Sequence, residues 1–128
     1  MASTTEGKRP LSPHLTVYRL PLAANMSILH RASGCFMALS MALVVWWFLG
    51  VAGGPEYFAF VDGWVTSWLG FLVLLGSAAA FFYHMMNGIR HLWWDTGGGF
   101  ELDAVTKSGF ATLAAAALLT LVILIVAL

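Results

Sequence analysis

Three long intervals of the chain contain no Asp, Glu, Lys or Arg. They run over 32–55, 63–89 and 108–128 and hold 24, 27 and 21 residues. Each is long enough for the roughly 20 residues with which a helix crosses a bilayer. Barrel strands are about 10 residues long and alternate in polarity, which these intervals do not. Because 60% of the 128 residues are hydrophobic and 9% are charged, a soluble domain is excluded.

The intervals predict one all-α integral membrane domain, 1–128, with three transmembrane helices. We expect the helices at about 27–51, 64–93 and 105–127, preceded by a polar arm over 1–26. Short loops that contain glycine, with proline in the first, separate the helices. No internal repeat divides the chain, so a second domain is not expected.

The basic residues gather at one end of the predicted helices. Four of them precede or open the first helix, namely Lys8, Arg9, Arg19 and Arg31, and two flank the second loop, Arg90 and Lys107. The first loop instead carries only the acidic residues Glu56 and Asp62. Lys and Arg favour the cytoplasmic side, which predicts a cytoplasmic N-terminus and a periplasmic C-terminus. We identify no signal or transit presequence in the arm, which favours a bacterial inner membrane. With a formal net charge of zero, the expected partner is membrane lipid and not nucleic acid.

Polar side chains interrupt the apolar helices along two stripes. One opens the first helix and the other lies toward the end of the second: Ser27, His30 and Arg31, then His84, Asn87, Gly88 and His91. Offsets of three, four and seven residues place each stripe on one helix face. Ionisable side chains within a span are costly and tend to mark function. Near a helix end, however, Arg31 and Arg90 could reach the headgroups as ordinary snorkelling cations.

His84 lies deepest of these side chains. Nine residues separate it from Trp93 at the predicted inner boundary, which at 1.5 Å each is roughly 13 Å. That depth is close to the bilayer midplane. A neutral imidazole there is either a hydrogen-bonded contact between helices or a metal or haem ligand, and we favour the ligand. Gly88, one turn along, would let a flat ring approach the backbone.

A haem with two axial ligands would need its second donor from another polypeptide. His84 and His91 are about 10 Å apart along one helix face, so they cannot lie on opposite sides of one iron. We expect His30 about one turn inside the boundary, much shallower than His84. His30, Arg31 and His91 suit the rim instead, where donors meet haem propionates through charge-assisted hydrogen bonds.

Two gapped motifs resemble those of the cytochrome b membrane-anchor subunits of succinate dehydrogenase. The first comprises Arg9-Pro10-Leu11, then Leu15, then Ser27-Ile28-Leu29-His30-Arg31-Ala32-Ser33. The second is His84-Met85-Met86-Asn87-Gly88-Ile89-Arg90-His91-Leu92-Trp93-Trp94-Asp95-Thr96-Gly97. Both motifs have the family's internal spacing, and together they extend the resemblance over nearly the whole chain.

The resemblance implies a larger anchor that pairs with a smaller membrane-anchor subunit and forms half of a six-helix bundle around one haem b. It implies His84 as the axial ligand, with the other ligand from the partner, and His30, Arg31 and His91 beside the propionates. Ser27 and Arg31 match positions that contact ubiquinone. An iron–sulfur subunit would deliver electrons from a flavoprotein subunit that oxidises succinate, so this chain is not catalytic alone.

Two other functions stay open from the residues alone. A haem-free structural anchor would use its histidines only to join helices. A proton-relay subunit or small transporter would use the buried His84 to carry protons. A reduced-minus-oxidised optical spectrum separates both alternatives from a haem protein.

Overall fold

The computed structural model describes residues 13–14 and 16–128. The motif residues Arg9, Pro10, Leu11 and Leu15 therefore lie outside the described residues. The described residues form four helices, which in order are α1 (Leu22–Ala52), α2 (Pro55–Val65), α3 (Trp68–Asp95) and α4 (Leu102–Ala127).

Three of these helices are long and apolar enough to cross a membrane. They are α1, α3 and α4, with 31, 28 and 26 residues. At 1.5 Å per residue their lengths are about 39–47 Å, which exceeds a hydrocarbon core of about 30 Å. The prediction of an all-α membrane chain with three spans is confirmed for the part of the chain that is described.

The largest differences from the expected helix boundaries are at the starts of the first two spans. α1 begins at Leu22, directly after the extended Pro21, because Leu and Ala are strong helix formers and continue the helix in front of Ser27. The second span begins at Trp68 rather than at 64, because Ser67 is the N-cap of α3 and accepts a hydrogen bond from the Gly70 amide at 3.1 Å.

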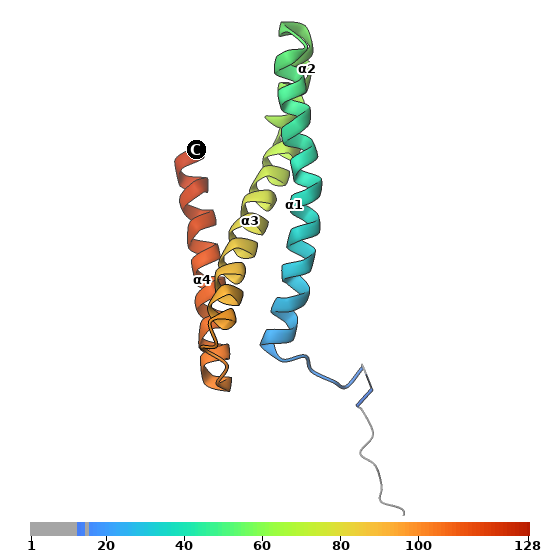
Figure 1. Cartoon of the computed structure of the whole chain (residues 1–128). Helices are drawn as coiled ribbons and strands as arrows, with labels where there is room; N and C mark the ends of the chain where they lie inside the picture. The colour runs from blue at the N-terminus through green and yellow to red at the C-terminus, as the bar shows by residue number, and fades with distance from the viewer. Residues whose placement is uncertain (1–12, 15) are drawn as a thin grey trace, which may run out of the picture.

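The short helix α2 occupies a segment that the sequence analysis assigned to a loop. The chain turns at Gly54, whose φ is +94°, a conformation that glycine adopts without steric cost. Pro55 follows at the first position of α2, where proline is preferred. Val61, fully buried, then packs against Gly50, where an added Cβ would lie 3.1 Å from the valine Cβ. α2 therefore folds back along the end of α1 (Figure 1).

α3 is the central helix of the arrangement. It packs against both α1 and α4, whereas α1 and α4 share few contacts and α4 leads away from α1 toward the C-terminus (Figure 1). The start of α1, the end of α3 and the start of α4 gather at one end of the molecule. We refer to this end, which carries Arg31, Arg90 and Lys107, as the basic end.

The side chains are distributed as expected for a membrane protein. Asn87 and Arg90 are buried, with 1% and 5% of their surface exposed, whereas Leu39 and Val126 are 73% and 79% exposed. Lipid tails solvate apolar side chains but cannot satisfy polar groups. The outer surface of α1, α3 and α4 is therefore suited to lipid or to the helices of another subunit.

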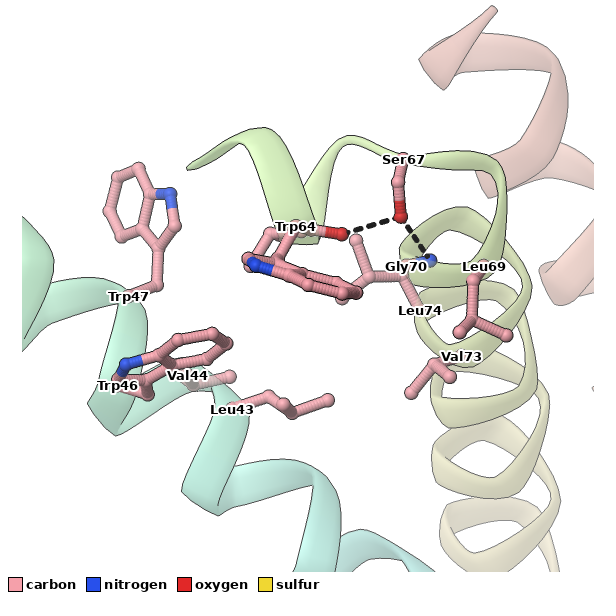
Figure 2. A pocket seen from close by; sticks show the side chains of 11 residues that line it. Leu43, Val44, Trp46, Trp47, Trp64, Ser67, Leu69, Gly70, Val73 and Leu74 are labelled. Carbon is pink, nitrogen blue, oxygen red and sulfur yellow. Dashed lines mark hydrogen bonds between the residues drawn. The ribbon is translucent and has the colours of Figure 1, made fainter. Parts of the chain in front are cut away.

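A cavity of about 340 Å³ lies at the end opposite the basic end, between α1, α2 and the start of α3. Its walls are apolar, and Figure 2 shows Leu43 and Val73 extending into it from α1 and α3. The Ser67 hydroxyl donates to the Trp64 carbonyl oxygen at 2.7 Å and caps α3. Leu43 is 13 residues beyond His30 on α1, or about 20 Å along the axis, so the cavity is separate from the predicted site.

Candidate functional site

Two histidines from different helices meet at the centre of the predicted site. The rings of His30 on α1 and His84 on α3 stack with their centroids 3.8 Å apart and an interplanar angle of 14°. The expectation that His30 is much shallower than His84 is therefore wrong. Because α1 begins at Leu22, His30 lies eight residues into the helix, or about 12 Å, instead of one turn.

The stacking excludes the pair as the two axial ligands of one iron. An imidazole binds a metal through a ring nitrogen, along the plane of the ring. Two rings in face-to-face contact at 3.8 Å leave no room for an iron between inward-facing nitrogens. No group of three or more His, Cys, Asp or Glu residues in the described ranges could hold a metal ion.

The hydrogen bonds of His84 fall on one ring nitrogen. Its Nδ1 lies 3.1 Å from the His30 carbonyl oxygen and 3.1 Å from the Ser33 Oγ. A carbonyl oxygen can only accept, so Nδ1 carries the proton and Nε2 is the basic nitrogen. Gly34 brings α1 close to the ring, because a Cβ added there would lie 3.1 Å from the His84 Cε1. His84 is thus held in the tautomer that leaves Nε2 free to accept a hydrogen bond or to bind a metal.

His91 extends the row of imidazoles toward the basic end. Its ring centroid lies 5.4 Å from that of His30, at 48°, and 5.0 Å from that of Trp94 in an edge-on contact. The His91 side chain is exposed in the isolated chain, and His30 is half-buried. A Cβ built on Gly88 meets no atom within 4 Å, so the described residues leave this side of α3 uncovered.

Ser27 and Arg31 lie one turn apart on the exposed side of α1. The Arg31 Nε donates to the Ser27 carbonyl oxygen at 3.3 Å, a contact within one helix. Both side chains are therefore accessible to a molecule that binds beside the first turns of α1. Ser27 and Arg31 are on the same helix as His30, but they are not part of the stacked pair of His30 and His84.

Arg90 is a buried helix contact and not a snorkelling cation. Its Nε donates to the Ser108 hydroxyl at 3.0 Å, and a terminal nitrogen donates to the Val105 carbonyl oxygen at 2.8 Å. A second terminal nitrogen lies 3.4 Å from the Asn87 Oδ1, and the guanidinium carbon lies 4.1 Å from the centre of the Trp94 ring. The snorkelling interpretation of Arg90 is therefore wrong, because α4 supplies acceptors close to the helix end.

Tyr83 is a polar contact that the sequence analysis did not single out. Its hydroxyl donates to the Met26 carbonyl oxygen at 2.7 Å, between α3 and α1. Met26 itself is 1% exposed and packs against Gly109 of α4, where an added Cβ would lie 3.0 Å from the Met26 Sδ. The signal available in the sequence was the position of Tyr83 directly before His84 in an otherwise apolar run.

These features define a small multi-pass membrane subunit whose spans are joined around a histidine contact. The sequence matches, over residues 5–123, the family described as succinate dehydrogenase/fumarate reductase transmembrane subunit. The chain belongs to this family and is a membrane anchor of complex II, which works with the other subunits of that complex.

Individual relatives agree with the family assignment. The chain is 45% identical over 126 residues to the succinate dehydrogenase cytochrome b556 subunit of Paracoccus denitrificans, covering 98% of this chain and 97% of the relative. It is 35% identical to the cytochrome b556 subunit of Rickettsia felis, over 91% and 90% of the two chains. It is 39% identical to the cytochrome b560 subunit of Marchantia polymorpha, over 88% and 86%. These relatives are named as b-type cytochromes.

Proposed function

We propose that this chain binds haem b and ubiquinone and passes electrons from the iron–sulfur subunit of succinate dehydrogenase to ubiquinone. Its spans form half of a six-helix bundle with a smaller anchor subunit, and a flavoprotein subunit supplies the electrons by oxidising succinate. The chain is one domain, 1–128, and is not catalytic alone. The observation that carries the proposal is the position of the His84 imidazole between two spans, where its Nδ1–H donates a hydrogen bond to the His30 carbonyl oxygen.

The residues of this chain fit a b-type haem. His84 would hold the haem iron as an axial ligand through Nε2. The partner anchor would supply a second ligand, because His30 is stacked on His84 and cannot bind the same iron. His30, Arg31 and His91 are the donors for the propionates on the side of the basic end. When bound, the haem would act as a one-electron carrier. The uncovered side of α3 at Gly88 provides room for a flat ring.

Ser27 and Arg31 form this chain's part of the quinone site. Reduction places negative charge on the quinone oxygens, and a hydroxyl and a fixed cation one turn apart stabilise that charge. Arg31 keeps its charge even where water is scarce. Both side chains are exposed on the isolated chain, which leaves them accessible to a substrate and to the iron–sulfur subunit.

The chain lies in a bacterial inner membrane with its N-terminus cytoplasmic and its C-terminus periplasmic. Arg31, Arg90 and Lys107 are at one end of the spans, and Lys107 also pairs with Asp103 at 2.6 Å. The loop at the other end carries Glu56 and no basic residue. Basic loops remain on the cytoplasmic side, so the basic end faces the cytoplasm and the iron–sulfur subunit.

The proposal is tested by the optical spectrum of the purified four-subunit complex. His84→Leu removes the only axial ligand from this chain, so the reduced-minus-oxidised haem spectrum is lost or shifted. His14→Leu, which changes an exposed histidine of the arm, is the control and leaves the spectrum unchanged. An unaltered haem spectrum in His84→Leu would contradict the ligand assignment.

A second candidate function follows from the row of imidazoles. His84, His30 and His91 follow one another at 3.8 and 5.4 Å, a sequence of groups that could relay protons. A colourless complex from haem-replete cells, recovered with every companion subunit, would favour this proton relay or a haem-free structural anchor. A haem spectrum that depends on His84 decides against both.

A further inference from the structure

Ser33 is a buried polar side chain on the face of α1 that meets α3. It is 8% exposed, in a chain whose outer surface is apolar. Its hydroxyl donates to the His30 carbonyl oxygen at 2.8 Å, one turn back along the helix. This is a common local bond for a helical serine. What is specific to Ser33 is that its oxygen also lies 3.1 Å from the His84 Nδ1 on the other helix.

The directions of these hydrogen bonds are determined by their donors and acceptors. The Ser33 proton is used on the His30 carbonyl oxygen, so the lone pairs of the serine oxygen are available to the His84 Nδ1–H. The His30 carbonyl oxygen lies at the same distance from Nδ1, 3.1 Å. The Nδ1–H therefore has two acceptors, both from α1.

Neighbouring groups restrict the ring in its other directions. His30 covers one ring face at 3.8 Å between centroids. Gly34 lies against the Cε1 edge, where a Cβ would approach to 3.1 Å. Because the hydrogen-bonding edge, one face and the Cε1 edge all meet α1, rotation of the ring requires breaking contacts with that helix. The direction of Nε2 is thus set by α1.

We infer that Ser33 is a positioning residue for His84, acting on the haem through the imidazole. This inference rests on the proposed haem binding. A hydrogen bond from Nδ1–H raises the donor strength of the opposite nitrogen and stabilises the oxidised metal, and such partners tune metal sites. Ser33 therefore lowers the reduction potential of the haem and fixes its axial ligand.

The test is an optical redox titration of the haem in the purified four-subunit complex. Ser33→Ala removes one acceptor from Nδ1–H, so the haem midpoint potential rises. We expect the ratio of reduced to oxidised haem at a fixed ambient potential to increase roughly threefold, which is about 30 mV for a one-electron couple. Ser33→Thr keeps the hydroxyl and restores the potential of the unmodified complex.

Ser40 offers a matched control on the same helix. Its hydroxyl makes the same kind of local bond, to the Phe36 carbonyl oxygen at 2.8 Å, but it meets Ser77 instead of an imidazole. Ser40→Ala therefore leaves the potential unchanged. Equal potentials in Ser33→Ala and Ser40→Ala would overturn the inference.

The remaining outcomes distinguish the role of Ser33 from the proposed role of His84 as a haem ligand. If Ser33→Ala loses haem, recovery of the haem in Ser33→Thr supports the role of the hydroxyl, whereas failure to recover refutes it. A His84→Leu complex that keeps the unmodified spectrum refutes the proposed haem ligand itself. A spectrum lost in His84→Leu together with an unshifted potential in Ser33→Ala leaves the proposed function intact and rejects only the role of Ser33.

Discussion

Replacing Arg90 by leucine should loosen α4 from α3. The substitution removes the donors to the Ser108 hydroxyl and to the Val105 carbonyl oxygen, at 3.0 and 2.8 Å. It also removes the guanidinium that lies 4.1 Å over the Trp94 ring. Leucine fills a similar volume and suits the apolar surroundings, so the expected loss comes from the polar contacts.

The structure allows the magnitude to be bracketed. A hydrogen bond between membrane helices contributes about 0.6 kcal/mol on average and at most about 1.7, so the two bonds to α4 contribute roughly 1–3 kcal/mol. The cation–π contact with Trp94 adds about 0.5–2 kcal/mol. We therefore expect Arg90→Leu to destabilise the chain by about 2–5 kcal/mol. Arg90→Lys keeps the charge but has one nitrogen for the two acceptors. We therefore expect it to destabilise the chain by less than Arg90→Leu does.

The assay is thermal dissociation of the purified four-subunit complex in detergent, with the intact fraction measured by size-exclusion chromatography after heating. Lys107→Gln is the control, since it removes a basic side chain from an exposed ion pair at the same end, where such pairs contribute little. Arg90→Leu should lower the dissociation temperature clearly, and Lys107→Gln should not. Equal stability of Arg90→Leu and the unmodified complex would refute the assignment of Arg90 as a stabilising contact between α3 and α4.

Two further predictions concern α1. Tyr83→Phe removes only the hydroxyl that bonds α3 to the backbone of α1 at 2.7 Å, so we expect a loss of about 1 kcal/mol, seen as a lower dissociation temperature; an unchanged temperature would contradict this contact. Ser27→Ala and Arg31→Leu should each lower succinate-dependent ubiquinone reduction more than they lower haem content, because they remove the proposed quinone contacts and leave the His84 imidazole in place. Normal quinone kinetics in both variants would count against the quinone site.

The uncharged intervals were sufficient to predict the three spans, because the cost of burying charge in a bilayer is large and local. They could not predict α2, because Glu56 and Asp62 fall within Pro55–Val65 and interrupt the uncharged intervals, so that the segment has the charge pattern of a loop. The break before α3 depends on one capping serine, Ser67. A cap of this kind leaves no trace in the charge pattern.

The candidate site could also be predicted only in part from the sequence. The stripe that contains His84 follows from helical periodicity within one segment. The contact of His84 with His30 and Ser33 does not, because it depends on how α1 packs against α3. α1 also begins five residues earlier than expected, which places His30 more than a turn further from the start of the helix. The burial of Arg90 likewise depends on acceptors that α4 provides, 15 to 18 residues further along the chain.

That distance along the chain has a consequence for biogenesis. During N-to-C synthesis, Arg90 emerges before Val105 and Ser108, so α3 on its own would present to the lipid, near the basic end, a guanidinium without its α4 acceptors. Entry of α3 and α4 together, as a helical hairpin closed by the glycine-containing turn at 96–101, satisfies the guanidinium as soon as the second helix arrives. Weakening the acceptors on α4 would then reduce the yield of correctly inserted chain, in addition to the stability of the finished complex.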